Sequence, residues 1–244
     1  DSVSAMAAVD LDQDGKCDLI TGGAPGRVTF LRQIEPGMFN RAARRDIRKL
    51  AASPTAFTVA DMSGDGHPQL LSVVDGDPAI WPLDGFSLGP IKRYPAGASI
   101  AGLVPADYDG DGLLDLAGIC PDDAAPVRIW FGRQGPDGVA PGPQTIFEMP
   151  PLFEFEAVGH PTSPASRIAV IERAARRIVL YDLEQQAVAD EPDRDAAFTV
   201  HGFPDPGQRD RAWSMIDIDG DGLSELVAAD SRSNAITIFR QSPD

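Results

Sequence analysis

The sequence lacks the features that mark a membrane-spanning or zinc-binding chain. No run of about 18 apolar residues occurs, so no segment predicts a transmembrane helix. The 244 residues include only two cysteines, Cys17 and Cys120, and no Cys-x-x-Cys or Cys/His cluster that would indicate zinc. The two cysteines lie at different positions of non-adjacent repeats, so we expect two free, partly buried thiols rather than a disulfide.

Basic residues and catalytic motifs are also scarce. Twenty-one Lys and Arg stand against 37 Asp and Glu, a net charge of −16, which argues against nucleic-acid binding. The three histidines, His67, His160 and His201, belong to no G-x-S-x-G, H-E-x-x-H or Walker motif. We therefore predict no catalytic residues and no enzyme activity. Because 14 of the 37 acids lie in four short loops, the acidic excess indicates bound cations.

The four acidic loops belong to a repeat. They begin at Asp10, Asp61, Asp107 and Asp217, and a fifth segment of the same length begins at Gly159 without the acids. The intervals between these five starts are 51, 46, 52 and 58 residues. Self-similarity at this period predicts a propeller or a solenoid.

Apolar runs flank each loop in the pattern of a propeller blade. One short run precedes each loop, a second follows it, and a third, often aromatic, begins about 20 residues past the loop start. The sequence thus predicts an all-β, single-domain β-propeller of about five four-stranded blades over residues 1–244, with blades near 1–52, 53–98, 99–150, 151–206 and 207–244.

Two features of the predicted propeller stay open. The segment from Phe39 to Ala52 is rich in Arg and Ala and is an alternative short helix. The last blade ends after its third strand, so the ring closes without an outer strand, is part of a larger propeller, or is completed by a partner.

The loops follow the pattern D-x-D-x-D-G-x-x-D/E, which suits Ca²⁺. This ion takes 6–8 oxygen ligands. Carboxylates at the first, third and fifth positions of the loop converge on one point, and glycine at the sixth position permits the sharp turn. The backbone carbonyl at the seventh position adds an oxygen, and the acid at the ninth position completes the ligand set. Three complete sets are predicted: Asp10, Asp12, Asp14, the Lys16 carbonyl and Asp18; Asp107, Asp109, Asp111, the Leu113 carbonyl and Asp115; and Asp217, Asp219, Asp221, the Leu223 carbonyl and Glu225.

The other two loops offer fewer acidic ligands for Ca²⁺. The second offers Asp61, Ser63, Asp65, the His67 carbonyl and Gln69, with two charged ligands, and predicts a weaker site. The fourth, from Gly159 to Arg167, has no acid at a ligand position and predicts no metal. An EF-hand is excluded because the twelfth position is Thr21, Gly118 and Ala228 in the complete loops, and the flanks predict strands.

These loops between apolar strands resemble the FG-GAP/VCBS repeat family, whose integrin-alpha-like repeats form calcium-binding β-propellers. The resemblance covers nearly the whole chain, and Gly23-Ala24-Pro25 and Phe131-Gly132 match its secondary signatures. It implies Ca²⁺ ligands at the loop acids named above. It also implies an extracellular or periplasmic protein, with any signal peptide removed, that acts in adhesion, glycan binding or subunit contacts.

Three functions follow as hypotheses. The first is a non-catalytic protein-interaction or assembly module with structural Ca²⁺. The second is a glycan-binding lectin that stacks sugars on Trp81, Trp130 or Trp213, although tryptophans in these strands more often pack between blades. The third is a carbohydrate-active enzyme on a propeller scaffold, for which the motifs give no support.

Overall fold

The computed structural model describes most of the first three repeats and parts of the last two. The described residues are 2–136, 138–149, 152, 155–159, 164–172, 177–181, 183, 199–201, 213–220, 225–230 and 235–240. They fall into two compact units: residues 1–105 with 113–153, and residues 106–112 with 154–244. None of the helices described is long and apolar enough to cross a membrane.

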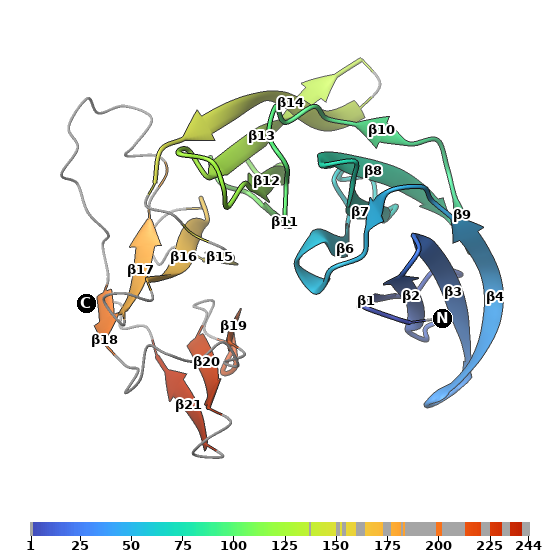
Figure 1. The fold of residues 1–244 in the computed structure, drawn as a ribbon. Coiled ribbons are helices and arrows are strands. Elements are labelled where there is room, and N and C mark those ends of the chain that lie inside the picture. The colour runs from blue at the N-terminus through green and yellow to red at the C-terminus, as the bar shows by residue number, and fades with distance from the viewer. Residues whose placement is uncertain are drawn as a thin grey trace. The chain divides into compact units, whose positions relative to one another are not determined.

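The first repeat is one four-stranded antiparallel sheet. Its strands are β1 (Ala5–Val9), β2 (Asp18–Gly23), β3 (Arg27–Glu35) and β4 (Met38–Asp46), which pair in chain order (Figure 1). The acidic loop from Asp10 connects β1 to β2. Each sheet is a blade, and the arrangement confirms the predicted order of three apolar strands followed by a polar outer strand.

The second and third repeats repeat this pattern. In the second, β6 (Phe57–Ala60), β7 (Gln69–Val74) and β8 (Asp77–Asp84) pair in order, while the short strands β5 (Leu50–Ala51), β9 (Ser87–Leu88) and β10 (Lys92–Arg93) pair at the margins. The 3-10 turn η1 (Pro54–Ala56) precedes β6. The third contains β11 (Gly102–Ala106), β12 (Asp115–Ile119), β13 (Val127–Gly135) and β14 (Gly138–Phe147).

The second unit holds the last two sheets. The fourth repeat has β15 (Phe155–Val158), β16 (Arg167–Glu172), β17 (Arg177–Tyr181) and β18 (Thr199–His201). The fifth has β19 (Trp213–Ile216), β20 (Glu225–Asp230) and β21 (Ala235–Phe239). Among the residues described, the fifth sheet has three strands, and the expected missing outer strand stays a prediction.

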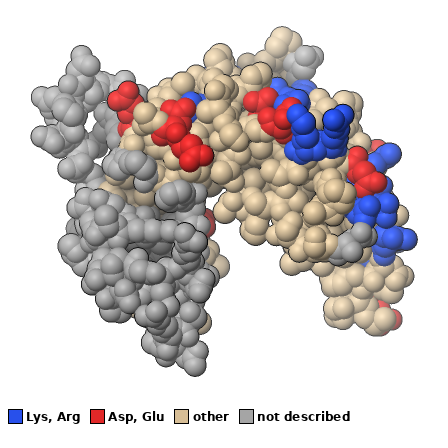
Figure 2. Space-filling view, viewed as in Figure 1, with Lys and Arg blue, Asp and Glu red and all other residues tan. Residues whose placement is uncertain are grey.

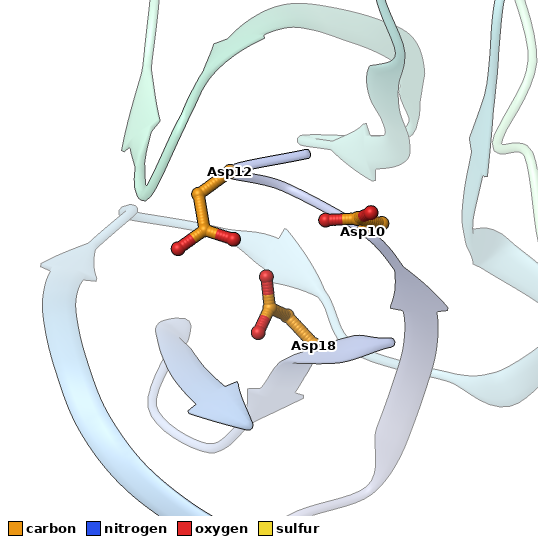
Figure 3. A group of neighbouring side chains, drawn as sticks. All are labelled: Asp10, Asp12 and Asp18. Carbon is orange, nitrogen blue, oxygen red and sulfur yellow. The ribbon is translucent and has the colours of Figure 1, made fainter. Parts of the chain in front are cut away.

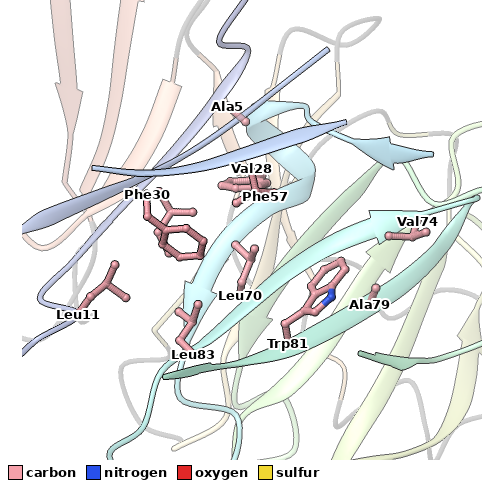
Figure 4. Close-up of a cluster of buried hydrophobic side chains, with 11 residues drawn as sticks. Ala5, Leu11, Val28, Phe30, Phe57, Leu70, Val74, Ala79, Trp81 and Leu83 are labelled. Atoms are coloured by element: carbon pink, nitrogen blue, oxygen red, sulfur yellow. The ribbon is translucent and has the colours of Figure 1, made fainter. Parts of the chain in front are cut away.

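The core of the first unit lies between successive blades. One buried cluster joins Val28 and Phe30 of the first blade to Phe57, Leu70 and Trp81 of the second (Figure 4). Such packing explains why the strands carry apolar residues on both faces, since each blade is covered by its neighbours.

A second buried cluster joins the second blade to the third. It brings Leu71 and Ile80 against Leu116 and Trp130. Trp81 and Trp130 are both buried, at 4 % and 2 % exposure, so their place in the core is confirmed and neither offers a sugar-stacking surface.

Two local expectations need correction. The alternative helix at Phe39–Ala52 is wrong, because β4 pairs with β3 and its Phe39 and Ala43 are half-buried on it. Arg and Ala favour helices, but strand pairing overrides such weak local preferences. Both thiols are free, as predicted, but Cys17 is exposed and only Cys120 is buried.

The packing between blades predicts which residues stabilise the first unit. Phe30→Ala should lower the free energy of unfolding by about 3–5 kcal/mol, because it leaves a cavity where a fully buried ring contacts the next blade. Ile34→Ala, at a side chain 40 % exposed on the same strand, should cost less than about 1 kcal/mol. Urea unfolding of both variants tests this, and equal losses would contradict the assignment of the core.

Candidate metal centres

Each acidic loop connects the first strand of a blade to the second, and its turn requires residues with a left-handed backbone. The glycines at the sixth position, Gly15, Gly66 and Gly112, have φ values of 83°, 85° and 83°. This confirms the predicted need for glycine there. The fourth position is left-handed as well, and in the first loop it is occupied by Gln13, with φ of 58°.

The carboxylate at the first position holds the turn closed. Oδ2 accepts a hydrogen bond from the N–H of the sixth residue in three loops: from Gly15 to Asp10 at 2.9 Å, from Gly66 to Asp61 at 2.7 Å and from Gly112 to Asp107 at 2.9 Å. Aspartate is favoured at such turns because its short side chain reaches backbone donors a few residues ahead. The first acid thus has a structural role in addition to its predicted role as a ligand.

The residue at the ninth position is a buried acceptor. In Asp18, which is 0 % exposed, Oδ2 accepts from the Leu11 N–H at 3.0 Å and Oδ1 from the Gln33 N–H at 2.8 Å. These two bonds tie the loop to the end of the third strand. Asp115 accepts likewise from the Gly132 N–H at 2.7 Å, and Glu225 from the Ile218 N–H at 2.8 Å.

Three loops bring acids close enough to share one cation. Carboxylate oxygens of the first, third and ninth positions lie within 4.8 Å of one another in three sets: Asp10, Asp12 and Asp18; Asp107, Asp109 and Asp115; and Asp217, Asp219 and Glu225. Figure 3 shows the first set, with oxygens of the three side chains directed toward a common centre. They lie in the three loops whose ligand sets the sequence predicted to be complete.

One oxygen in the first loop lacks a partner that a cation would supply. Oδ1 of Asp12 is buried and has no hydrogen-bond partner. A buried carboxylate oxygen without a partner is costly, whereas a hard cation between several such oxygens satisfies them together. The donor set, made only of oxygen, suits Ca²⁺ in particular.

The acid at the fifth position of the first loop, Asp14, lies outside this group. Asp14 Oδ2 contacts Lys16 Nζ at 3.0 Å and Arg32 Nη2 at 3.4 Å. The hydrogen bond from the Lys16 side chain is the main cause of a pKa of Asp14 below its usual value. Asp111 is likewise absent from its group. Asp221 and Leu223 lie outside the described residues, as do residues 160–163 of the fourth loop.

Arginines at the ends of third strands were not singled out from the sequence. Arg32 Nη2 lies 2.7 Å from Asp12 Oδ2, and Arg240 Nη2 lies 3.5 Å from Asp219 Oδ2. Both therefore contact the acid at the third position. The available signal is a repeated Arg-Gln pair in the last part of the third strand or directly after it, at 32–33, 133–134 and 240–241.

The second loop is closed by an amide. Gln69 Oε1 accepts from the Met62 N–H at 2.6 Å, as the ninth acid does elsewhere. Its Nε2 donates to Ser63 Oγ at 2.9 Å and to the His67 carbonyl at 2.6 Å. The pKa of Asp65 is lowered, first by the backbone N–H of His67. The predicted weaker calcium site here stays a prediction.

Comparison with solved structures supports the β-propeller fold. The chain matches the crystal structure of BBS1N in complex with ARL6DN with a TM-score of 0.58 and 16 % identity, over 99 % of this chain and 67 % of that chain. The dihydro-heme d1 dehydrogenase NirN matches at a TM-score of 0.46, with 14 % identity over 92 % of this chain and 45 % of that one. No curated protein matches the sequence.

Comparison with family models identifies the repeats. The model of the FG-GAP-like repeat matches residues 10–72 and again residues 61–118. The matches contain the first three acidic loops and the strands from β2 to β11. Residues 10–118 therefore consist of FG-GAP-like repeats.

Proposed function

We propose that this protein is a calcium-binding β-propeller that acts as a non-catalytic protein-interaction or assembly module, with Ca²⁺ structural in the loops. The observation that carries the metal is the convergence of three acids at the same place in three blades, with a buried unpartnered oxygen on Asp12. Because Ca²⁺ is plentiful outside cells, an extracellular or periplasmic location fits such sites.

Calcium suits these loops better than magnesium. Mg²⁺ demands near-ideal octahedral geometry and keeps several of its waters, whereas Ca²⁺ accepts more protein oxygens at variable geometry. Three carboxylates together with a carbonyl, as in each complete loop, supply such a set. The ion would neutralise carboxylates that otherwise repel one another and would fix the connection between the first and second strands of the blade.

An exposed basic surface supports the role in protein interaction. We define it by Arg41, Arg44, Arg45, Arg48 and Lys92, all exposed, on β4, β10 and the segment after β4. In Figure 2, Lys and Arg gather on the flank that carries β4 and β10. Among the residues described, Arg41, Arg45, Arg48 and Lys92 make no ion pair. In a chain of net charge −16 such a surface is complementary to an acidic segment of a partner protein.

The alternatives have less support in the structure. The lectin hypothesis relied on exposed tryptophans, and Trp81 and Trp130 are buried in the core. The side chain of Trp213 lies outside the described residues. For an enzyme, the described loop acids are accounted for by turn hydrogen bonds and the cation groups.

Calcium removal tests the metal directly. Ca²⁺ at millimolar concentration should raise the melting temperature by at least about 5 °C over EDTA, and Mg²⁺ should not, because binding to the folded state alone stabilises it by mass action. The double variant Asp107→Ala, Asp109→Ala should shrink the shift, whereas Glu35→Gln, an exposed acid outside the loops, should leave it unchanged. An unchanged melting temperature, with no Ca²⁺ in elemental analysis of the untreated protein, would mean that the loops are polar turns that bind no metal.

The second loop tests the ligand chemistry. Gln69→Glu should raise the Ca²⁺ affinity of this loop about tenfold or more, because a carboxylate replaces an amide N–H₂ that donates to Ser63 Oγ and the His67 carbonyl. Equilibrium dialysis at subsaturating Ca²⁺ should then show about one additional ion bound per chain. Asn40→Asp, the same chemical change on the exposed face of β4, should add none. An unaltered stoichiometry in the Gln69→Glu protein would mean that the second loop cannot accept the ion.

The basic surface can be tested by charge reversal. The protein should bind a fluorescein-labelled ten-residue polyglutamate peptide, with an affinity that falls as salt rises. Reversal of Arg41, Arg44 and Arg45 to Glu should abolish binding, and replacement of all three by Lys should preserve most of it. Equal binding by the Glu variant, or preferential binding of a DNA oligonucleotide or of phosphatidylserine vesicles, would contradict a protein partner at this surface.

A further inference from the structure

The complete acidic loops share a feature that the incomplete loops lack. An Arg-Gln pair lies in the last part of the third strand, or directly after it, in each blade with a complete loop: Arg32-Gln33, Arg133-Gln134 and Arg240-Gln241. By strand register, the residues equivalent to Arg32-Gln33 are Pro82-Leu83 in the second repeat and Phe131-Gly132 in the third, where Arg133 comes directly afterwards. An arginine at this end of the third strand therefore occurs in the blades with the full set of acids and not in the second and fourth repeats.

The buried anchor at the ninth position brings the arginine to the loop. In the first blade the Gln33 N–H bonds to Asp18 Oδ1 at 2.8 Å, which fixes the end of β3 beside the loop. The preceding residue, Arg32, then reaches Asp12 Oδ2 at 2.7 Å and Asp14 Oδ2 at 3.4 Å. In the third blade the Gly132 N–H makes the equivalent bond to Asp115, and Arg133 follows it.

The contact leaves room for a cation at the same carboxylate. Arg32 pairs with Oδ2 of Asp12, while Oδ1 of that residue is the buried oxygen without a partner. The first loop contains four acids, Asp10, Asp12, Asp14 and Asp18, against Lys16 and Arg32. The net charge of these six side chains is therefore −2, which one divalent ion neutralises.

We propose that Arg32 is a built-in counter-ion that holds the first acidic loop together without metal and thereby lowers the affinity of this loop for Ca²⁺. The inference rests on the proposed calcium sites. Its sign follows from Coulomb's law, because the guanidinium attracts the carboxylates of the metal-free loop and repels a divalent ion bound to the same carboxylates. Arg240, which lies 3.5 Å from Asp219 Oδ2, takes the corresponding role in the fifth loop.

The first loop contains its own reporter for this test. Cys17 is exposed in the loop and Cys120 is buried, so a thiol-reactive, environment-sensitive fluorophore labels the loop selectively. Ca²⁺ titration of the labelled full chain at low salt gives the Kd of this loop alone. Arg32→Gln should lower that Kd about five- to tenfold. The same substitution, in the unlabelled protein, should lower the melting temperature in EDTA more than in excess Ca²⁺.

Two variants serve as controls. Arg32→Lys keeps the charge and should retain most of the wild-type Kd. Arg27→Gln removes an arginine of the same strand, which pairs with Asp46 at 3.1 Å away from the loop, and should leave the Kd unchanged.

The outcomes distinguish failure of the proposed calcium site from failure of the proposed role of Arg32. A wild-type protein with no Ca²⁺ response in fluorescence or melting temperature would overturn the proposed calcium site itself. A wild-type response combined with an unchanged Kd in Arg32→Gln would overturn the counter-ion alone. A weaker Kd in that variant would also overturn it, since Arg32 would then be positioning Asp12 for the bound ion.

Discussion

The acidic loops depend on the buried acceptor at their ninth position. Asp18 is fully buried, and an ionised carboxylate without partners would be very costly there. Two backbone N–H groups satisfy it, one from the start of its own loop and one from the end of the third strand. The same group therefore fixes the loop, joins it to a strand far along the chain, and places a negative charge where the first and third acids converge.

This constraint explains the substitution in the second blade. Gln69 retains an oxygen acceptor for the Met62 N–H, so the anchor survives the loss of charge. The amide nitrogen then satisfies Ser63 Oγ and the His67 carbonyl, which are oxygens at the third and seventh positions. One residue thus supplies hydrogen bonds at positions where an ion would make ligand bonds, and the turn keeps its geometry with fewer acids. Backbone structure and ion binding are separable in this repeat.

Much of the fold could be predicted because its signals are local and repeated. The short apolar run before the first loop was expected as a strand and forms β1 (Ala5–Val9). The acid pattern placed the loops between the first and second strands of each blade. The segment at Phe39 was ambiguous, because its Arg and Ala residues suit a helix and only pairing with β3 decides for a strand. Local preference cannot reveal a partner strand.

The sequence predicted which acids form the site but not which residues contact those acids. The spacing identified Asp10, Asp12 and Asp18, which the structure brings together, but it also included Asp14, whose carboxylate contacts Lys16 and Arg32 instead. Arg32 lies 18 residues after Asp14. Its proximity depends on the bond between Gln33 and Asp18, so it follows from the fold and not from the loop motif.

Repeat architecture accounts for the uneven distribution of acids along the chain. In the first unit each blade buries its apolar residues against the next one, through the two clusters that contain Trp81 and Trp130. Stability in such proteins is a sum of terms within repeats and between neighbours, so a change in one loop is felt mainly in its own blade. The second loop has a neutral anchor, and yet its blade packs against both the first and the third blade. The loops that keep all their acids therefore carry a charge that packing does not require. Such a charge remains costly unless a cation, either an arginine side chain or a bound metal ion, compensates it.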